Sequence, residues 1–234
     1  MFVERLKTGR LRHSSSVYGR SREGIPLTVW IPEEGAPEIL ILAAIHGDEP
    51  ETAVVVSDAL RAIDRGGLKN AAILCGNPDG LLRGTRGNAI GVDLNRNFPT
   101  SNWAPDPVLY KSRREGPQDI ELSPGSEPAS EPETRALLSL IDEMKPRSVV
   151  SLHGALACID DEGGSKLGRW IAERTALPLE EVGYPTPGSF GSWAREHDLT
   201  LVTYELEAAS LYDLKERHSP VLIELLTGAM EVGT

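Results

Sequence analysis

The sequence predicts an α/β fold: a single domain with a mostly parallel, mixed and twisted sheet and helices on both faces. Short uninterrupted apolar runs are typical of strands buried on both faces of a sheet. Amphipathic helical segments alternate with these runs, which indicates parallel strands joined by crossover helices. The chain has 234 residues, 40% of them hydrophobic, which suffices for one core. We therefore expect one domain over residues 1–234, with a flexible segment at residues 1–15.

Composition and charge exclude two classes of partner. The formal net charge of −11 opposes phosphate binding, so we expect no nucleic-acid partner. No apolar run approaches the roughly 20 residues that a membrane span needs. Residues 1–22 are basic and polar without an apolar core, unlike a secretory signal, which predicts a cytoplasmic location. Cys75 and Cys158 lie in apolar contexts and are expected to be free thiols, a disulfide being the less favoured alternative.

The first half of the chain predicts two buried strands around one helix. Residues 25–31 alternate and contain Pro26, so they indicate a strand near an edge. The apolar run at residues 39–45 is a buried strand, and a helix follows at about residues 51–62. Another short buried strand covers residues 71–75 and stops at a cluster of turn residues.

The second half begins with a long irregular stretch. Residues 81–132 contain many Pro, Gly, Ser and Glu residues, and a loop of such length is usually functional or mobile. We expect its part at residues 101–131 to form the rim of the active site. The remaining elements are predicted as a helix from 132 through 144, a strand at 147–152, a helix at 165–176, a strand at 200–204 and a helix at about 219–230.

The main functional motif lies where the buried strand at residues 39–45 ends. His46 follows the strand, and Glu49 stands three residues later, on the turn into a helix. The helix start is marked by a turn glycine, a capping residue, an early proline and a first-turn acid, at Gly47, Asp48, Pro50 and Glu51. An imidazole and a carboxylate so placed can reach one zinc ion. Because a lone His-x-x-Glu also occurs by chance in solvated loops, this prediction depends on partners further along the chain.

Two more predicted strands end in residues of the same chemical kind, His153 and Glu205. The carboxyl ends of parallel strands meet at one edge of a sheet, where open α/β sheets bind ligands. Two histidines and one glutamate are a known ligand set for catalytic zinc. We therefore predict one zinc ion per chain, bound by His46, Glu49 and His153.

A zinc hydrolase also needs a general base, and Glu205 is the acid at the end of a buried strand. Glu207 is a rival that strand alternation disfavours only weakly. His13, His197 and His218 lack a strand-end context and are interpreted as surface or structural residues. Asp160, Asp161 and Glu162 are interpreted as a solvated loop.

These motifs resemble those of the zinc carboxypeptidase family, in the family's order and over nearly the whole chain after about residue 15. The resemblance implies a zinc carboxypeptidase-like fold, the ligands named above and Glu205 as the base. The matching segments are HGDE at residues 46–49, NPDG at 77–80, GVDLNRNFP at 91–99, GSEP at 125–128, LACI at 156–159, GYPTPGSFGSW at 183–193 and TYEL at 203–206.

Further roles follow from the resemblance alone. Arg86, nine residues before Asn95, stands where short bacterial members keep the arginine that stabilises the oxyanion. Asn95 and Arg96 would bind the terminal carboxylate of the substrate, and Tyr184 matches the family's mobile phenol. Asn95 and Arg96 also fit a turn and a surface cation, and Tyr184 also fits simple packing beside two prolines.

Among family members, the chain is most similar to bacterial amidases that act on murein peptides. The resemblance implies hydrolysis of the γ-D-glutamyl-meso-diaminopimelate amide bond of the murein tripeptide L-Ala-γ-D-Glu-meso-diaminopimelate, during recycling of cell-wall peptides. One alternative is an N-acyl amino acid deacylase like the related desuccinylases. Another is a catalytically inactive peptide-binding module. The sequence leaves the oligomeric state open, a homodimer included.

Overall fold

The computed structural model describes residues 9–112, 118–181 and 186–230. Its centre is an eight-stranded mixed sheet in the order β1-β2-β4-β3-β7-β10-β8-β9. These strands are β1 (Ser15–Arg20), β2 (Pro26–Trp30), β3 (Ile39–Leu42), β4 (Ala71–Ile73), β7 (Ser148–Gly154), β8 (Cys158–Asp160), β9 (Leu179–Glu180) and β10 (Thr200–Leu206). A separate two-stranded sheet consists of β5 (Val108–Ser112) and β6 (Gln118–Leu122).

The four central strands, β4, β3, β7 and β10, run parallel to one another, whereas β2 and β8 pair antiparallel on either side of them. The carboxyl ends of β3, β7 and β10 therefore lie side by side at one edge of the sheet. The predicted mostly parallel, mixed sheet is confirmed. The sequence motifs at these three strand ends are brought together by this arrangement.

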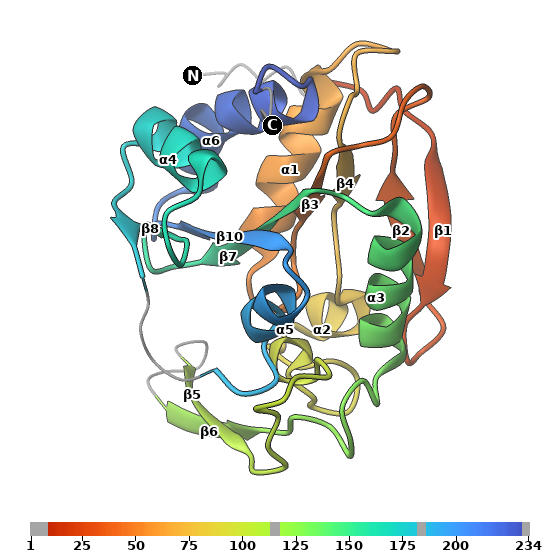
Figure 1. Ribbon diagram of the computed structural model, residues 1–234, viewed down its shortest axis with the longest axis vertical. Coiled ribbons are helices and arrows are strands. Elements are labelled where there is room, and N and C mark those ends of the chain that lie inside the picture. The colour runs from red at the N-terminus through yellow and green to blue at the C-terminus, as the bar shows by residue number, and fades with distance from the viewer. Residues whose placement is uncertain (1–8, 113–117, 182–185, 231–234) are drawn as a thin grey trace, which may run out of the picture.

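Helices cover both faces of the sheet, as the sequence predicts (Figure 1). Alternate residues of β3 face different helices: Ile39 and Ile41 belong to one buried cluster, and Leu40 and Leu42 to the other. The first cluster contains residues of α1 (Pro50–Ala62), α4 (Lys166–Thr175) and α6 (Leu211–Leu226), and the second contains residues of α3 (Pro132–Met144) and α5 (Phe190–Glu196).

Local sequence accounts for the long helices. In α1 the buried residues Val55, Val56, Ala59 and Leu60 recur at the spacing of one helical face, and Pro50 occupies the first turn, where its missing N–H costs nothing. In α3 the corresponding stripe is Leu137, Leu140 and Ile141. In the described part of the chain, no helix is both long and apolar enough to cross a membrane.

Several boundaries differ from the prediction. The strand predicted over residues 39–45 ends at Leu42, because the backbone turns through a positive φ of 48° at Ala44. The strand predicted over residues 71–75 likewise ends early, at Ile73. The last helix begins at Leu211 instead of about residue 219, with Pro220 inside the helix and not near its start. Pro220 therefore does not mark the start of this helix.

The edge of the sheet also differs from the prediction. β1 was not predicted, since its residues are mostly exposed and carry no apolar alternation. It pairs with β2, so the segment with Pro26 lies next to the edge strand, in agreement with the predicted strand near an edge. The stretch at 81–132, predicted as irregular, contains the end of α2 (Pro78–Arg83), the 3-10 turn η1 (Leu94–Arg96) and the β5–β6 hairpin. Cys75 and Cys158 are free thiols, as expected.

Candidate metal centre

The turn after β3 places His46 and Glu49 at the carboxyl edge of the sheet. Glu49, not Asp48 as predicted, is the N-cap residue of α1, and its side chain makes no capping bond. Thr52 holds the turn instead: its Oγ1 accepts from the N–H of Ala44 at 3.0 Å and donates to the carbonyl of Glu49 at 2.7 Å. The carboxylate of Glu49 is thereby left to face the two histidines.

Gly47 allows this turn to pack against the loop that carries Arg86. A Cβ at Gly47 would lie 2.1 Å from the carbonyl carbon of Gly80, so no larger residue fits without movement. The Gly47 N–H donates to the carbonyl of Arg86 at 3.2 Å. This backbone contact brings the guanidinium of Arg86 to the same site as Glu49.

Three candidate ligands converge at the site. The Nδ1 atom of His46 lies 2.9 Å from Oε1 of Glu49 and 3.1 Å from Nδ1 of His153. Oε2 of Glu49 lies 3.2 Å from Nδ1 of His153. All three side chains are buried, and one ligand atom from each lies within 4.8 Å of the others. The structure thus brings together the three residues that the sequence singled out as zinc ligands.

The outer ring nitrogens fit a metal site as well. Nε2 of His46 lies 3.3 Å from Oδ1 of Asp93, and Nε2 of His153 lies 3.0 Å from Oγ of Ser151. Partners on Nε2 favour the tautomer that carries its proton there, which leaves the Nδ1 lone pairs directed at Glu49. Two Nδ1 atoms and a carboxylate are a donor set suited to zinc, so the residues fit the metal that the sequence implies.

The charges at this centre are strongly coupled. Burial alone would raise the pKa of Glu49, but His46 and His153 hold it well below its usual range. Burial and Arg86 act to lower the pKa of His46, but the carboxylates of Glu49 and Asp93 outweigh them and raise it to about 8. Burial likewise opposes ionisation of Asp93, whose pKa is nevertheless strongly lowered by His46 and Arg86. Both acids are therefore ionised, as ligands and their supporting groups must be.

Arg86 is held between these two acids. Its Nη1 donates to Oε1 of Glu49 at 2.9 Å, and its Nε lies 3.4 Å from Oδ2 of Asp93. On its other side the guanidinium carbon lies 4.2 Å from the ring centroid of Tyr110, a cation–π distance. The guanidinium of Arg86 thus lies beside the metal centre, and the ring of Tyr110 from the β5–β6 hairpin packs on its other side.

Glu205 lies beside the candidate ligands. It is paired with His153 in the parallel register of β10 and β7, and it is 9% exposed. Its Oε2 accepts from the N–H of Leu156 at 3.4 Å. Burial raises the pKa of Glu205, and the nearby charge of Glu49 adds to this effect, while His153 opposes it. A raised carboxyl pKa suits a group that must both accept and return a proton.

The rival acid, Glu207, has different partners. Its Oε2 lies 2.7 Å from Nε2 of His218, and its Oε1 lies 2.6 Å from Nη1 of Arg217. Glu205, but not Glu207, lines the cavity at the metal centre. His218 is fully buried and also lies 2.7 Å from the hydroxyl of Tyr204, which agrees with its interpretation as a structural residue.

The predicted substrate-binding pair, Asn95 and Arg96, lies within η1. Asn95 Oδ1 accepts from the N–H of Phe190 at 2.9 Å, which ties it to the start of α5. Arg96 Nη1 donates to the carbonyl of Asn95 at 2.6 Å. Both line the cavity described below. Tyr184 lies outside the described residues, although Glu181 and Thr186 on either side of that segment line the cavity.

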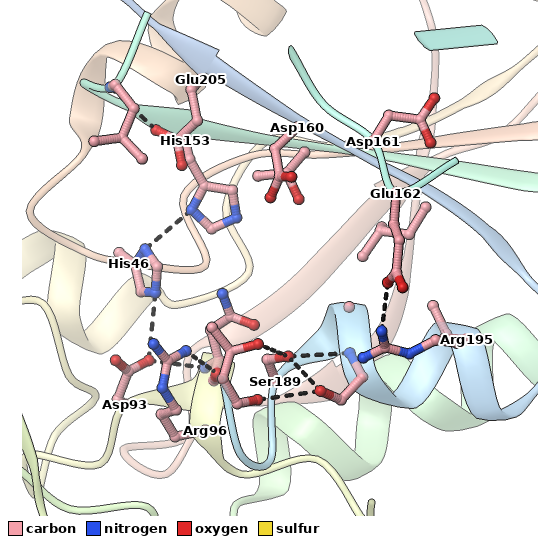
Figure 2. Close-up of a pocket in the computed structure, with 18 of the residues that line it drawn as sticks. His46, Asp93, Arg96, His153, Asp160, Asp161, Glu162, Ser189, Arg195 and Glu205 are labelled. Carbon is pink, nitrogen blue, oxygen red and sulfur yellow. Dashed lines mark hydrogen bonds and ion pairs between the residues drawn. The ribbon is translucent and has the colours of Figure 1, made fainter. Parts of the chain in front are cut away.

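One cavity of about 1190 Å³ is lined by the three candidate ligands and by Glu205, Arg86, Asn95 and Arg96. Figure 2 shows part of this lining, including His46, His153 and Glu205. It extends from the metal centre along β10 to the ends of β8 and α5. Part of the stretch predicted to form the rim, residues 101–131, lines it through Asn102, Val108, Leu109 and Tyr110. The acids at 160–162, interpreted from the sequence as a solvated loop, also line this cavity. A cavity of this size accommodates a small peptide.

Sequence reasoning gave no role to Asp93, Ser151 or Tyr110. The first two had a visible signal. Ser151 interrupts a buried apolar strand two residues before His153, so the two side chains share a face. Asp93 is the acid of the matching segment GVDLNRNFP, two residues before Asn95. Tyr110 had no such signal, because only the return of the β5–β6 hairpin places it over Arg86.

The fold and this site define a class of protein. The family model for zinc carboxypeptidases matches residues 72–159, and the chain belongs to the zinc carboxypeptidase family. It is 42% identical to murein peptide amidase A of Escherichia coli K12 over 226 residues, covering 95% of this chain and 93% of that protein. Murein peptide amidase A of Vibrio campbellii is 41% identical over 89% of this chain and 86% of its own length.

Solved structures agree with this assignment. The crystal structure of the murein-tripeptide amidase of Escherichia coli O157 superimposes with a TM-score of 0.90 at 40% identity, covering 99% of this chain and 98% of that one. Bovine thrombin-activatable fibrinolysis inhibitor matches with a TM-score of 0.74 at 20% identity, covering 92% of this chain and 88% of that chain, a likeness of fold alone. The zinc carboxypeptidase-like fold expected from the sequence is confirmed.

Proposed function

We propose that this chain is a zinc-dependent murein peptide amidase. It hydrolyses the γ-D-glutamyl-meso-diaminopimelate amide bond of L-Ala-γ-D-Glu-meso-diaminopimelate. The observation that carries the proposal is the convergence of His46, Glu49 and His153 beside Glu205, in a cavity large enough for a small peptide. Identity of 41–42% to murein peptide amidases over most of the chain supports the choice of substrate.

One zinc ion per chain would be held by His46, Glu49 and His153, and it would supply a Lewis acid at the scissile carbonyl. Asp93 and Ser151 orient the two imidazoles through Nε2. Because each ligand is supported by a second residue, the geometry is fixed before substrate arrives. Preorganisation of this kind lowers the cost of reaching the transition state.

The chain's own groups handle the proton and the developing charge. Glu205 accepts a proton from the attacking water and returns it to the leaving nitrogen of diaminopimelate. Arg86 stabilises the negative charge that forms on the carbonyl oxygen, and Asn95 and Arg96 bind the carboxylate next to the scissile amide. The pairing of Arg86 with Glu49 and Asp93 holds its guanidinium in place for this role. Tyr184 is proposed to contact the substrate from the segment between Glu181 and Thr186.

We place this reaction in the cytoplasm, in the recycling of cell-wall peptides. The decisive experiment is product analysis of the zinc-loaded protein with the murein tripeptide, using mass spectrometry to detect free diaminopimelate and L-Ala-γ-D-Glu. An ordinary α-linked dipeptide and an N-succinyl amino acid serve as comparison substrates. Preferred cleavage of the tripeptide is expected. Preferred cleavage of the succinyl compound would instead indicate a deacylase, and binding without any cleavage would indicate a binding module.

A further inference from the structure

The cavity continues beyond the metal centre along one face of the sheet. β8 pairs antiparallel with β10, so that Asp160 lies opposite Thr203 and Cys158 opposite Glu205. Directly paired residues share a face, as do residues two apart on one strand. Glu205, Thr203 and Asp160 therefore lie on the same face, and all three line the cavity. Strand rise and strand spacing place the Cα atom of Asp160 about 8 Å from the Cα atom of Glu205, because the two residues are two positions apart along the strand and one strand apart across the sheet.

A cation stands in the same part of the cavity. Arg195 of α5 forms an ion pair with Glu162, which follows β8, and both residues line the cavity (Figure 2). Their side chains are 57% and 56% exposed, respectively. Exposed ion pairs contribute little to stability, so the guanidinium of Arg195 can exchange Glu162 for a carboxylate on a ligand at low cost.

The neighbouring acid Asp161 is committed to the fold. Its Oδ2 accepts from the N–H and from the hydroxyl of Ser165, both at 2.7 Å, at the start of α4. Asp161 is also buried, with 6% exposure. Of the three consecutive acids at 160–162, Asp161 thus supports a loop and Glu162 pairs with Arg195. Asp160 lines the cavity between the metal centre and that ion pair (Figure 2).

We infer that Asp160 and Arg195 select the far end of the diaminopimelate side chain, with Asp160 on its ammonium group and Arg195 on its carboxylate. This inference rests on the proposed function. The distal carbon lies four carbon–carbon bonds of about 1.5 Å from the carbon that carries the scissile nitrogen, so the extended chain spans about 5 Å. That span reaches from beside Glu205 to the region between Asp160 and Arg195.

Charge balance is the physical basis of this selection. The far end of diaminopimelate carries one positive and one negative group, and this region of the cavity offers one partner for each. An acid alone would accept lysine equally well, since lysine has the ammonium group without the carboxylate. The Arg195 guanidinium therefore distinguishes diaminopimelate from lysine, and Asp160 distinguishes it from side chains without an ammonium group.

The test uses four γ-D-glutamyl substrates that differ only at the far end of the side chain. These carry diaminopimelate, lysine, 2-aminopimelate and norleucine, which have both groups, the ammonium group alone, the carboxylate alone and neither. The readout is kcat/KM of the zinc-loaded enzyme. Asp160→Asn should lower the preference for ammonium-bearing over ammonium-free substrates by about 10- to 100-fold. Arg195→Gln should lower the preference for carboxylate-bearing over carboxylate-free substrates by a similar factor.

Matched controls separate selectivity from folding. Arg174→Gln removes a comparable exposed arginine of α4, which is away from the cavity and pairs with Glu224 at 2.9 Å. Asp142→Asn removes an exposed acid of α3. Both controls should keep the wild-type preferences. Unchanged zinc content in Asp160→Asn and Arg195→Gln shows that the site is intact.

Three results would overturn the inference. If the wild type cleaves all four substrates equally, or if neither variant changes the preferences, the proposed function stands but Asp160 and Arg195 do not select the side chain. If the wild type cleaves none of the γ-D-glutamyl substrates, the proposed function fails and this inference fails with it.

Discussion

Glu205 of β10 lies directly opposite His153 of β7 in the parallel register, and both side chains face the same cavity. The proposed base and a proposed zinc ligand are therefore fixed to each other by two hydrogen-bonded central strands. No loop movement is needed to bring them together. This rigidity separates metal binding from proton transfer, so each can be tested without disturbing the other.

Metal binding is tested by His153→Ala. This variant should lose most of its bound zinc and remain folded, because Glu49 and His46 come from a single turn and two ligands hold the ion far less tightly than three. Zinc per chain is measured by atomic emission, and folding by circular dichroism. His197→Ala, at an exposed position outside the cavity, should keep its zinc. Stoichiometric zinc in His153→Ala would remove this residue from the site.

The general base is tested by Glu205→Gln, which keeps the shape but cannot accept a proton. Turnover should fall by about 10²- to 10⁴-fold with zinc content unchanged. Glu207→Gln is the matched control, since Glu207 contacts His218 and Arg217 outside the cavity. It should change thermal stability more than turnover. Inactivity of Glu207→Gln alongside normal activity of Glu205→Gln would reverse the assignment.

Substitutions of Arg86 and Arg96 should give different kinetic defects. Arg86→Ala should mainly lower kcat, by about 10²- to 10³-fold, because its contact strengthens as the oxyanion forms. Arg96→Lys should mainly raise KM, since a lysine cannot form the two-pronged contact with a carboxylate. A substrate amidated at that carboxylate should be cut poorly by the wild type, and Arg96→Lys should discriminate less against it. Identical kinetic defects in both variants would contradict these roles.

Stability should depend on pH through His218. Burial and Arg217 lower its pKa, and Glu207 only partly compensates. A lowered folded-state pKa means that this group contributes stability above its unfolded pKa of about 6.5, which is lost as the pH falls through the folded value. The free energy of unfolding, measured with urea from pH 7.5 to pH 5, should fall in the wild type. His218→Gln should give a flatter profile, and equal slopes would contradict the prediction.

The hairpin over the site should respond to ligand. Residues 101–131 carry Leu109, which is 69% exposed, and Tyr110, both of which line the cavity. Limited proteolysis should cut this stretch first, and a bound substrate analogue should slow the cut. Mass spectrometry of the fragments locates the cleavage. If the cleavage rate is the same with and without the analogue, the stretch lies outside the binding site.

Much of this fold could be predicted because its signals are local. The apolar runs of β3 and β7 and the helical periodicity of α1 and α3 are visible within a few residues. His46, His153 and Glu205 were found because each follows such a run. The edge strand β1 and the start of α6 were missed, since exposure hides the first and Pro220 obscures the second.

The unpredicted part of the site depends on contacts between distant segments. Tyr110 meets Arg86 only through the β5–β6 hairpin, and Arg195 meets Glu162 only because α5 packs against β10, the neighbour of β8 in the sheet. Asp160 appeared to be a loop acid until the antiparallel pairing with β10 placed it opposite Thr203. The spacing of residues in a single sequence does not predict such contacts, because they depend on how distant segments pack in the folded protein.

The sheet places its strands in a different order from that in which they are synthesised. β10 lies between β7 and β8, although both are made before it. Until residues 200–206 leave the ribosome, β7 has an unpaired edge, and an unpaired apolar strand is a template for wrong pairing. His46, Glu49 and His153 are all made by then, so a nascent chain contains every proposed zinc ligand before it contains its base. Completion of the sheet and acquisition of activity therefore coincide in a single late event of biosynthesis.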